Sequence, residues 1–384
     1  MTRSLALLSA TRACPKHMVY GPCGGVRHDG GCEVAGIACS FTALADQLAE
    51  SRFDPSDAAI PESARESGDA LRAATERSAA AMAFAGLVAV GGLITADLTI
   101  RTTEAGALAE AAPLMSGLSA VVVGEPPGLG ASLSPAHKAL VLQSAGIRVI
   151  AGVNCRDRNR VALEGELAAL ADIGVAGVLG VTGDHPASTV RPDAEAVFDL
   201  DSTRVAALAR RAGMFVAVAE QPIAPPVAYR PHRLALKVEA GAELCFLNLC
   251  GGPDRIARFA AEARAAGAGV PLVASVPVIT SARGAARLAA LPGIALPEGL
   301  AERVASAPDP ERAGIDEAAR LAASLLTIPG VVGVHLSAIG GDDDPSGLGA
   351  ARTIARTAEL IRERAAAAPP TAILTVPAQA GPAA

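Results

Sequence analysis

Four cysteines near the start of the chain are the residues whose type and spacing point most directly to chemistry. They fall within 26 residues at the spacing C-x8-C-x8-C-x6-C, as Cys14, Cys23, Cys32 and Cys39. These gaps exceed the roughly two to four residues that separate paired ligands in zinc knuckles. Glycine pairs at 24–25 and 30–31 allow backbone amides to approach sulfur closely, which suits an iron–sulfur cluster as well as zinc. Four clustered thiols in a reducing compartment are more typical of a metal site than of two disulfides. Unliganded cysteines in a small core are the structural alternative.

A second set of residues, all polar except one glycine, lies in or just after the last part of short apolar segments. Its members are Asp97, Asn154, Arg156, Gly183, Asp184, Glu220, Asn248 and His335. Singly, such residues are typical of helix caps and solvated turns. If they gather at one edge of a sheet they line a polar pocket, and a carboxylate on the long loop that holds Asp184 could then contact a ligand.

Arginines are dense after the third apolar segment, where Arg156, Arg158 and Arg160 occur within five residues. Beside a polar pocket they would suit an anionic ligand such as a phosphate or a polyglutamate tail. A solvated helix start is the alternative. Lys237 lies at the end of an expected helix, where the helix dipole also favours a cation.

The elements that would position these residues are eight short apolar runs that alternate with helical patterns. The runs cover residues 93–98, 118–123, 147–154, 176–182, 214–220, 243–249, 270–277 and 331–338. The clearest helical patterns cover residues 160–173, 202–212, 253–266 and 349–365. Apolar strands that alternate with helices indicate a parallel sheet covered on both faces. Eight such units predict a (β/α)8 TIM barrel, with the chemistry at the carboxyl ends of its strands. The first run is not followed by the G-x-G-x-x-G of a dinucleotide-binding sheet, which disfavours that alternative.

Composition divides the chain into four parts. Residues 1–50 form the Cys-rich, metal-binding module, and residues 51–70, rich in proline, serine and mixed charge, are typical of a linker. Residues 71–365 form the barrel, and residues 366–384 are expected to be a disordered tail.

The overall charge and aromatic content exclude some classes of partner. The net charge is −6, and the chain has no Trp, two Tyr and seven Phe. Nucleic acids and anionic membranes require a positive surface, and bases also require stacking partners. We therefore expect neither nucleic acid nor membrane as a partner.

The chain is expected to be cytoplasmic. The apolar stretch within residues 1–14 is too short for the core of a signal peptide. The long uncharged run at residues 78–96 is nominally long enough to span a bilayer, but it is split by two glycines and passes into a strand-like segment. A buried helix followed by a buried strand is the preferred interpretation of this run.

Several stretches resemble, in the same order, the barrel of the methylenetetrahydrofolate reductase family. They include ITADLTIRTTEAGAL, GVNCRDRNRVALEGELAALADIGVAGVLGVTGDHP, LKVEAGAELCFLNL and GVVGVHLSAIG, and the similarity runs from about residue 92 to residue 340. The opening CPKHMVYGPCGGVRHDGGCEV resembles the small Cys-rich domain that accompanies some of these reductases, either as a fused segment or as a partner subunit.

The resemblance implies reduction of 5,10-methylenetetrahydrofolate to 5-methyltetrahydrofolate, in one-carbon and methionine metabolism. A flavin, FAD or FMN, would carry hydride from NAD(P)H to the folate. The resemblance places the general acid at Asp97 and a carboxylate that stabilises the developing cation at Asp184. Keeping Asp97 protonated near neutral pH would require a raised pKa.

The resemblance also assigns ligand contacts. Flavin contacts fall on Asn154, Gly183, Asp184, Glu220 and Lys237, and substrate contacts on Asn248, Arg156 and His335. For the four cysteines it favours a [4Fe–4S] cluster over zinc, and an electron-carrier protein is then an expected partner. A homo-oligomer is the expected assembly.

The chain departs from the family pattern in ways that bear on this chemistry. Asp97 stands where the family has a Glu followed by two prolines, and its shorter side chain would place the carboxyl about 1–1.5 Å further back. Asn248 replaces a longer Gln, and residues 229–234 do not reproduce the polar pattern that holds the flavin phosphates. These departures leave open a reductase that uses the nicotinamide directly, a folate-binding accessory subunit, and a folate-dependent methyltransferase without flavin.

Overall fold

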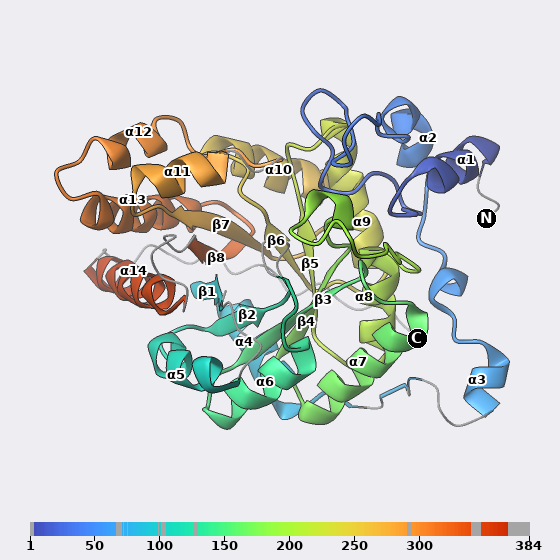
Figure 1. Cartoon of the computed structure of the whole chain (residues 1–384), viewed down its shortest axis with the longest axis horizontal. Coiled ribbons are helices and arrows are strands. Elements are labelled where there is room, and N and C mark those ends of the chain that lie inside the picture. Colours follow the sequence, from blue (N-terminus) through green and yellow to red (C-terminus); the bar gives the residue numbers. More distant parts are fainter. Residues whose placement is uncertain are drawn as a thin grey trace.

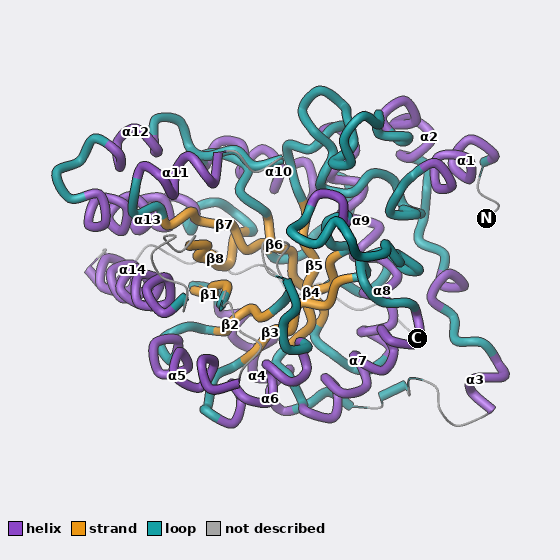
Figure 2. Tube along the Cα trace, viewed as in Figure 1, coloured by secondary structure: helices purple, strands orange, loops and turns teal. Residues whose placement is uncertain are grey.

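Eight parallel strands close into a barrel in which each strand pairs with the next in sequence and β8 pairs with β1. The computed structural model describes residues 4–66, 71, 73–74, 76–98, 100, 105–125, 130–289, 293–338 and 347–367. The strands are β1 (Leu93–Asp97), β2 (Ala120–Val123), β3 (Val149–Asn154), β4 (Gly177–Val181), β5 (Val216–Glu220), β6 (Leu244–Leu247), β7 (Leu272–Val278) and β8 (Val331–Ala338). They form the centre of the molecule, with helices around them (Figures 1 and 2). The predicted (β/α)8 barrel is confirmed, and each strand lies within one residue of the segment expected to hold it.

Eleven helices of the described residues belong to the barrel. They are α4 (Ala79–Val90), α5 (Ala105–Met115), α6 (Pro135–Ser144), α7 (Arg160–Ile173), α8 (Ser202–Arg211), α9 (Arg230–Glu239), α10 (Pro253–Ala265), α11 (Ala282–Ala289), α12 (Leu300–Ala305), α13 (Pro310–Leu325) and α14 (Leu348–Ala367). Short 3-10 turns, η3 (Pro186–Ser188) and η4 (Val227–Tyr229), follow β4 and β5. The four helices that the sequence pattern predicted most clearly are confirmed as α7, α8, α10 and α14.

Helix α7 illustrates how the local sequence determines an element. The side chain of Asn159 accepts a hydrogen bond from a backbone N–H of the first turn, which satisfies one of the free donors there. Leu163, Leu167 and Leu170 recur at helical spacing and are fully buried against the barrel. Gly174, with a φ of +72°, ends the helix in the left-handed conformation that glycine adopts without strain.

An apolar cluster fills the barrel at the amino-terminal end of the strands. Its members come from α4 and from alternate strand positions: Ala81, Phe84, Val88, Leu93, Ala120, Val122, Ile150, Ala176, Phe215, Ala217, Leu244, Phe246 and Val273. Phe84 of α4 meets Phe215 edge to face, with ring centroids 5.2 Å apart, so that α4 closes this end. The expected strand is buried, whereas the expected buried helix, α4, buries only the face that carries Ala81, Phe84 and Val88 and leaves Met82 and Val90 exposed.

The N-terminal segment lies along the outside of the barrel beside α9 (Figure 1). It contains α1 (Leu5–Ala13), η1 (Thr42–Leu44), α2 (Ala45–Ala49), η2 (Pro55–Ala58) and α3 (Glu62–Glu66). Its small apolar core is completed by Tyr229 and Leu236 of the barrel, which pack against Met18, Tyr20 and Phe41. The Cys-rich module therefore shares its core with the barrel.

The segment expected to be a linker packs on the barrel over the part that the structure describes. Ala58 and Ile60 are buried in the main apolar core, and Arg160 Nη2 donates to the carbonyl oxygen of Ala59 at 2.7 Å. Residues 67–70 of that expected linker lie outside the described residues. Of the expected tail, residues 366 and 367 belong to α14, and residues 368–384 lie outside the described part.

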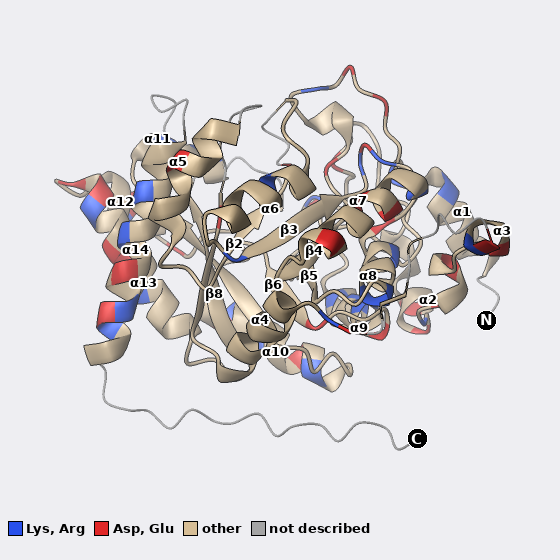
Figure 3. Ribbon diagram, turned by 90° about the horizontal axis from the view of Figure 1, so that it is seen from below, with Lys and Arg blue, Asp and Glu red and all other residues tan. Residues whose placement is uncertain are grey.

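Among the described residues, no helix combines the length and the apolar composition that a bilayer span requires. Basic and acidic side chains are interspersed over the helices rather than gathered in one basic block (Figure 3).

A glycine in α13 gives a test of the packing of the helical layer. A Cβ at Gly314 would overlap the backbone carbonyl oxygen of Ile279, which follows β7. We expect Gly314→Ala to lower the free energy of unfolding by about 1–3 kcal/mol or more in urea titrations, because backbone must move to admit the methyl group. Gly165→Ala in α7 is the matched control: no atom lies within 4 Å of its Cβ. The control should raise the free energy of unfolding by about 0.5–1 kcal/mol. Equal effects of the two substitutions would contradict this packing.

Candidate active site

The carboxyl ends of β1 and β8 place four polar side chains side by side inside the barrel. Thr95 is in register with His335, and alternation along each strand turns Asp97 and Ser337 to the same face. His335 Nε2 lies 3.1 Å from Asp97 Oδ2, and Ser337 Oγ donates to the same oxygen at 3.2 Å. The predicted acid and one predicted substrate contact are therefore direct partners.

The surroundings of Asp97 lower its pKa rather than raise it. Burial raises the pKa of this carboxyl, but the charge on His335 and the hydrogen bonds from His335 and Ser337 outweigh that effect. The Asp97 side chain is 44% exposed, whereas that of His335 is 8% exposed. Asp97 is therefore an accessible carboxylate with a buried imidazole behind it, which differs from the raised pKa that a lone general acid would need.

The loop after β4, which carries Gly183 and Asp184, is held by the Cys-rich module. Lys16 Nζ donates to the carbonyl oxygen of Gly183 at 2.7 Å and pairs with Glu33 Oε1 at 2.5 Å. Glu33 Oε1 also accepts a hydrogen bond from the backbone N–H of His185 at 2.5 Å. Burial lowers the pKa of Lys16, but the charges of Cys23, Glu33 and Asp184 raise it above its ordinary value. Lys16 therefore remains a cation between the cysteines and Asp184.

Glu220 and Lys237, two of the expected flavin contacts, form a buried pair with each other. Glu220 is the last residue of β5 and shares the outward parity of Val216 and Val218, so it faces α9 instead of the barrel interior. Lys237 Nζ of α9 lies 2.8 Å from Glu220 Oε2 and also donates to the carbonyl oxygen of Ala219 at 2.5 Å. Neither side chain is more than 4% exposed.

Two arginines of α9 complete this charge cluster. Arg230 Nη1 lies 3.4 Å from Glu220 Oε1, and Arg233 Nε lies 3.8 Å from Oε2. Burial alone would raise the pKa of Glu220, but Lys237 and the two arginines hold it at about 2. Glu220 is therefore a stable anion surrounded by three cations.

The same arginines bind the backbone of the Cys-rich module. Arg230 donates to the carbonyl oxygens of Pro22 at 3.1 Å and Cys23 at 2.9 Å. Arg233 donates to the carbonyl oxygen of Tyr20 at 2.8 Å. The charge cluster at the end of β5 therefore docks the module onto the barrel.

Four of the five expected flavin contacts do not present free polar groups toward a common site. The Asn154 amide donates to Glu125 Oε2 at 2.7 Å, the carbonyl oxygen of Gly183 is taken by Lys16, and Glu220 and Lys237 satisfy each other. Side chains engaged in this way do not fit a flavin held through them.

The three arginines after β3 are each paired with an acidic side chain. The pairs are Arg156 with Asp157 at 2.8 Å, Arg158 with Glu125 at 2.6 Å, and Arg160 with Glu164 at 2.8 Å. This arrangement favours the structural interpretation of the cluster over an anion site. Asn248 is exposed after β6, and its side-chain oxygen accepts a hydrogen bond from the backbone N–H of Leu249 at 2.9 Å.

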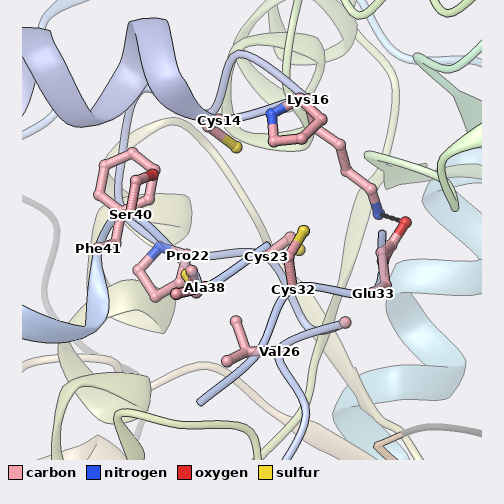
Figure 4. A pocket seen from close by; sticks show the side chains of 13 residues that line it. Cys14, Lys16, Pro22, Cys23, Val26, Cys32, Glu33, Ala38, Ser40 and Phe41 are labelled. Carbon is pink, nitrogen blue, oxygen red and sulfur yellow. Dashed lines mark ion pairs between the residues drawn. The ribbon is translucent and has the colours of Figure 1, made fainter. Parts of the chain in front are cut away.

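The four cysteines line a single pocket of the module, together with Lys16, Glu33, Val26 and Phe41 among others. The sulfur atoms of Cys14, Cys23 and Cys32 face the same space (Figure 4). Burial raises the pKa of Cys14 to about 11 and also raises the pKa of Cys32 and of Cys39, so these three are thiols near neutral pH. No three His, Cys, Asp or Glu side chains of the described residues converge closely enough to hold a single metal ion. The sulfurs surround a space and do not meet at a point.

Sequence reasoning missed several residues of this arrangement. Thr95 and Ser337 stand two positions from Asp97 and His335, so strand alternation was a signal that could have found them. Lys16, Glu33 and Arg230 contact partners more than 150 residues away, and no local pattern indicates such pairs.

The fold is a (β/α)8 barrel, and enzymes with this fold carry their active sites at the carboxyl ends of the strands. The accessible carboxylate of this chain lies at that end. A family model described as methylenetetrahydrofolate reductase matches residues 107–344, and one described as methylene-tetrahydrofolate reductase C terminal matches residues 2–62. The first match covers more than half of the chain, so this chain belongs to the methylenetetrahydrofolate reductase family. Membership indicates a folate-related, oxidoreductase-like enzyme.

Solved structures with a similar fold have low sequence identity to this chain. An uncharacterized protein from Clostridium thermocellum, described as binding two copies of 5-methyl-5,6,7,8-tetrahydrofolic acid, covers 71% of this chain and 96% of its own at 11% identity, with a TM-score of 0.51. A putative lyase/mutase from Burkholderia cenocepacia J2315 covers 76% and 87% at 16% identity, with a TM-score of 0.42. At such identities the first similarity shows the fold alone. No curated protein matches the chain.

The docking role of Arg230 can be tested by removing its charge. We expect Arg230→Met to lower the free energy of unfolding by about 3–5 kcal/mol, because Glu220 and the carbonyl oxygens of Pro22 and Cys23 lose a buried partner. Limited proteolysis should then cleave within residues 4–50 before it cleaves the barrel. Arg356→Met, which removes an exposed pair with Glu311, is the matched control and should change stability by less than about 1 kcal/mol. Equal proteolysis of the two variants would show that the module does not depend on Arg230.

Proposed function

We propose that the chain reduces 5,10-methylenetetrahydrofolate to 5-methyltetrahydrofolate. Membership of the methylenetetrahydrofolate reductase family supports a folate substrate. The observation that carries the proposal is the Asp97 carboxylate, which is accessible at the carboxyl end of β1 and is held from behind by His335 and Ser337. In a (β/α)8 barrel, a polar group at this end of a strand lies where substrates bind.

The reaction needs a proton before it needs a hydride. The five-membered ring that bridges the two folate nitrogens opens to an iminium ion when the leaving nitrogen is protonated. Asp97 is the proposed proton donor to that nitrogen. Asp184, on the loop that Lys16 and Glu33 hold in place, is the proposed carboxylate that stabilises the positive charge of the iminium ion.

The proposed hydride donor is a reduced nicotinamide that acts on the folate directly. A flavin is the usual carrier implied by the family, but Glu220 and Lys237 are buried and paired with each other, and Asn154 is bound to Glu125. Side chains engaged in this way do not fit a flavin held through them, which favours direct transfer from the nicotinamide.

Asp97→Asn tests the proposed acid. Purified protein is incubated with methylenetetrahydrofolate and NADH or NADPH, with and without added FAD or FMN, and 5-methyltetrahydrofolate is measured. We expect wild-type turnover without added flavin, and a loss of about 10²- to 10⁴-fold in kcat in the variant, because the amide cannot donate the proton of a carboxylic acid. Asp193→Asn, which alters an exposed carboxylate paired with Arg191, should keep wild-type activity.

Three results would count against this assignment. Full turnover by Asp97→Asn would remove Asp97 from the mechanism, and strict dependence on added flavin would restore the flavin as carrier. Folate binding without turnover under every condition would instead favour an accessory subunit or a methyltransferase.

We further propose that Cys14, Cys23, Cys32 and Cys39 hold an iron–sulfur cluster. Zinc–sulfur bonds of about 2.3 Å require four sulfurs to converge on one point, whereas these sulfurs surround a pocket. A polynuclear cluster bound by four thiolates suits that arrangement better. When bound, such a cluster would supply single electrons from a carrier protein to a site next to the loop that carries Asp184.

Metal analysis tests this assignment. Protein reconstituted without oxygen with iron and sulfide should contain iron and acid-labile sulfide and show a broad visible absorption. Replacing Cys23 with Ser should abolish both, because a cluster ligand is lost. Cys250→Ala, which removes a buried thiol of the barrel core, should leave both unchanged. Stoichiometric zinc without labile sulfide would show that the module is a zinc site.

A further inference from the structure

A chain of hydrogen bonds inside the barrel connects Asp97 to the backbone of β8 through His335. His335 Nε2 faces Asp97 Oδ2 at 3.1 Å, and its other nitrogen, Nδ1, lies 3.0 Å from Thr95 Oγ1. The same hydroxyl oxygen lies 3.3 Å from the carbonyl oxygen of Val334. The imidazole meets the ring of Phe246 edge to face, with centroids 5.3 Å apart, which fixes its orientation.

The Thr95 hydroxyl has one hydrogen and two neighbours that can accept it. When His335 Nδ1 carries no proton, the hydroxyl donates to Nδ1. When Nδ1 is protonated, it donates to Thr95 Oγ1, and the hydroxyl turns to the carbonyl oxygen of Val334. Nε2–H bonds to Asp97 in both states, so the imidazole can gain or lose a proton while each polar atom keeps a partner.

The three side chains of this hydrogen-bonded series differ in their exposure to solvent. Thr95 is fully buried, His335 is 8% exposed, and Asp97 is 44% exposed. On the opposite side of His335, β7 places Ser275 in register with it. Among the described residues, Asp97 is the only charged side chain that is bonded to His335. Within the described part of the chain, the imidazole is therefore linked to the accessible end of the barrel through its bond to Asp97.

We propose that Asp97, His335 and Thr95 form one proton-holding unit, in which Asp97 is the catalytic residue and His335 and Thr95 are positioning residues. The proposal rests on the reduction proposed above. The unit holds one exchangeable proton in either of two places: at Nδ1 of His335 beside a carboxylate, or at Oδ1 of Asp97 beside a neutral imidazole. The lowered pKa of Asp97 agrees with the first arrangement as the resting state.

The second arrangement is the reactive one. Asp97 Oδ1–H protonates the leaving nitrogen, the bond between that nitrogen and the methylene carbon breaks, and its electron pair stays on the nitrogen. The other ring nitrogen uses its lone pair to form the C=N bond of the iminium ion. Hydride from the reduced nicotinamide then converts the methylene carbon to a methyl group and leaves the nicotinamide oxidised. Nε2–H of His335 continues to hold the carboxylate through Oδ2, and the unit takes its next proton from solvent.

The pH dependence of kcat/KM tests the unit. His335→Gln keeps an N–H donor but cannot change charge. We expect kcat/KM near neutral pH to fall about 10- to 100-fold. The pH above which the rate declines should move down by about one unit or more, because the proton can then be held only by the carboxyl. An unchanged pH profile in His335→Gln would overturn the proposal and leave the proposed function intact.

Thr95 offers a matched pair of variants. Thr95→Val keeps the shape but leaves Nδ1 without a partner, so the charged imidazole becomes less favourable and the decline should again move to lower pH. Thr95→Ser keeps the hydroxyl and should restore the wild-type profile. Thr357→Val removes another fully buried Thr hydroxyl, which bonds only to the carbonyl oxygen of Thr353 among the described residues, and should have no effect on the profile. Identical profiles for Thr95→Val and Thr95→Ser would count against the unit.

Imidazole NMR provides a readout that does not need turnover. The chain has six His, and the His335 signal is identified by its loss in His335→Gln. In the wild type we expect the His335 ring to report two linked titration steps, and in Asp97→Asn a single step. If wild-type protein reduces no folate, the proposed function fails and this measurement alone decides the unit: linked steps support it, and a ring unaffected by Asp97→Asn overturns it.

Discussion

In a closed barrel every second residue of a strand faces the interior, and this alternation determines what each polar residue can do. Thr95 and Asp97 face inward on β1, where they meet His335 and Ser337 on the neighbouring strand β8. Glu220 also ends a strand, but its parity turns it outward to α9. Two carboxylates that each end a strand therefore have different environments. One is accessible and backed by an imidazole, and the other is buried among three cations.

The outward carboxylate explains why the Cys-rich module and the barrel form one body. A buried anion costs several kcal/mol unless cations are fixed around it, and those cations in turn need acceptors for their remaining N–H groups. Arg230, fully buried, finds them in Glu220 and in the carbonyl oxygens of Ala224, Pro225, Pro22 and Cys23. The last two belong to the module. Without the module, Arg230 would lack two of its hydrogen-bond acceptors. Without the barrel, the apolar core of the module would lose Tyr229 and Leu236, which cover it.

The fold could be predicted from the sequence because strand and helix periodicities are local, and eight repeats of one unit leave few ways to close a sheet. The site was only partly predictable. Asp97 and His335 could each be identified as residues of the strand ends, but their contact depends on β1 lying beside β8, about 240 residues away. Transferring flavin contacts by residue type placed Glu220 and Lys237 at a ligand, whereas parity and burial direct them to each other. The carbonyl partners of Arg230 could not be predicted, because every residue has a backbone carbonyl oxygen and the sequence does not indicate which of them Arg230 contacts.

The module also bears on the chemistry at the mouth of the barrel, because it holds the loop that follows β4. Lys16 and Glu33 border the cysteine pocket and bind that loop through the carbonyl oxygen of Gly183 and the N–H of His185. Asp184 lies between these two anchored residues, so its backbone position is set by the module and not by the barrel alone. Lys16 is buried between Glu33, the cysteine pocket and Asp184, where charges are weakly screened. One ammonium group therefore borders both the cysteine pocket and the loop after β4.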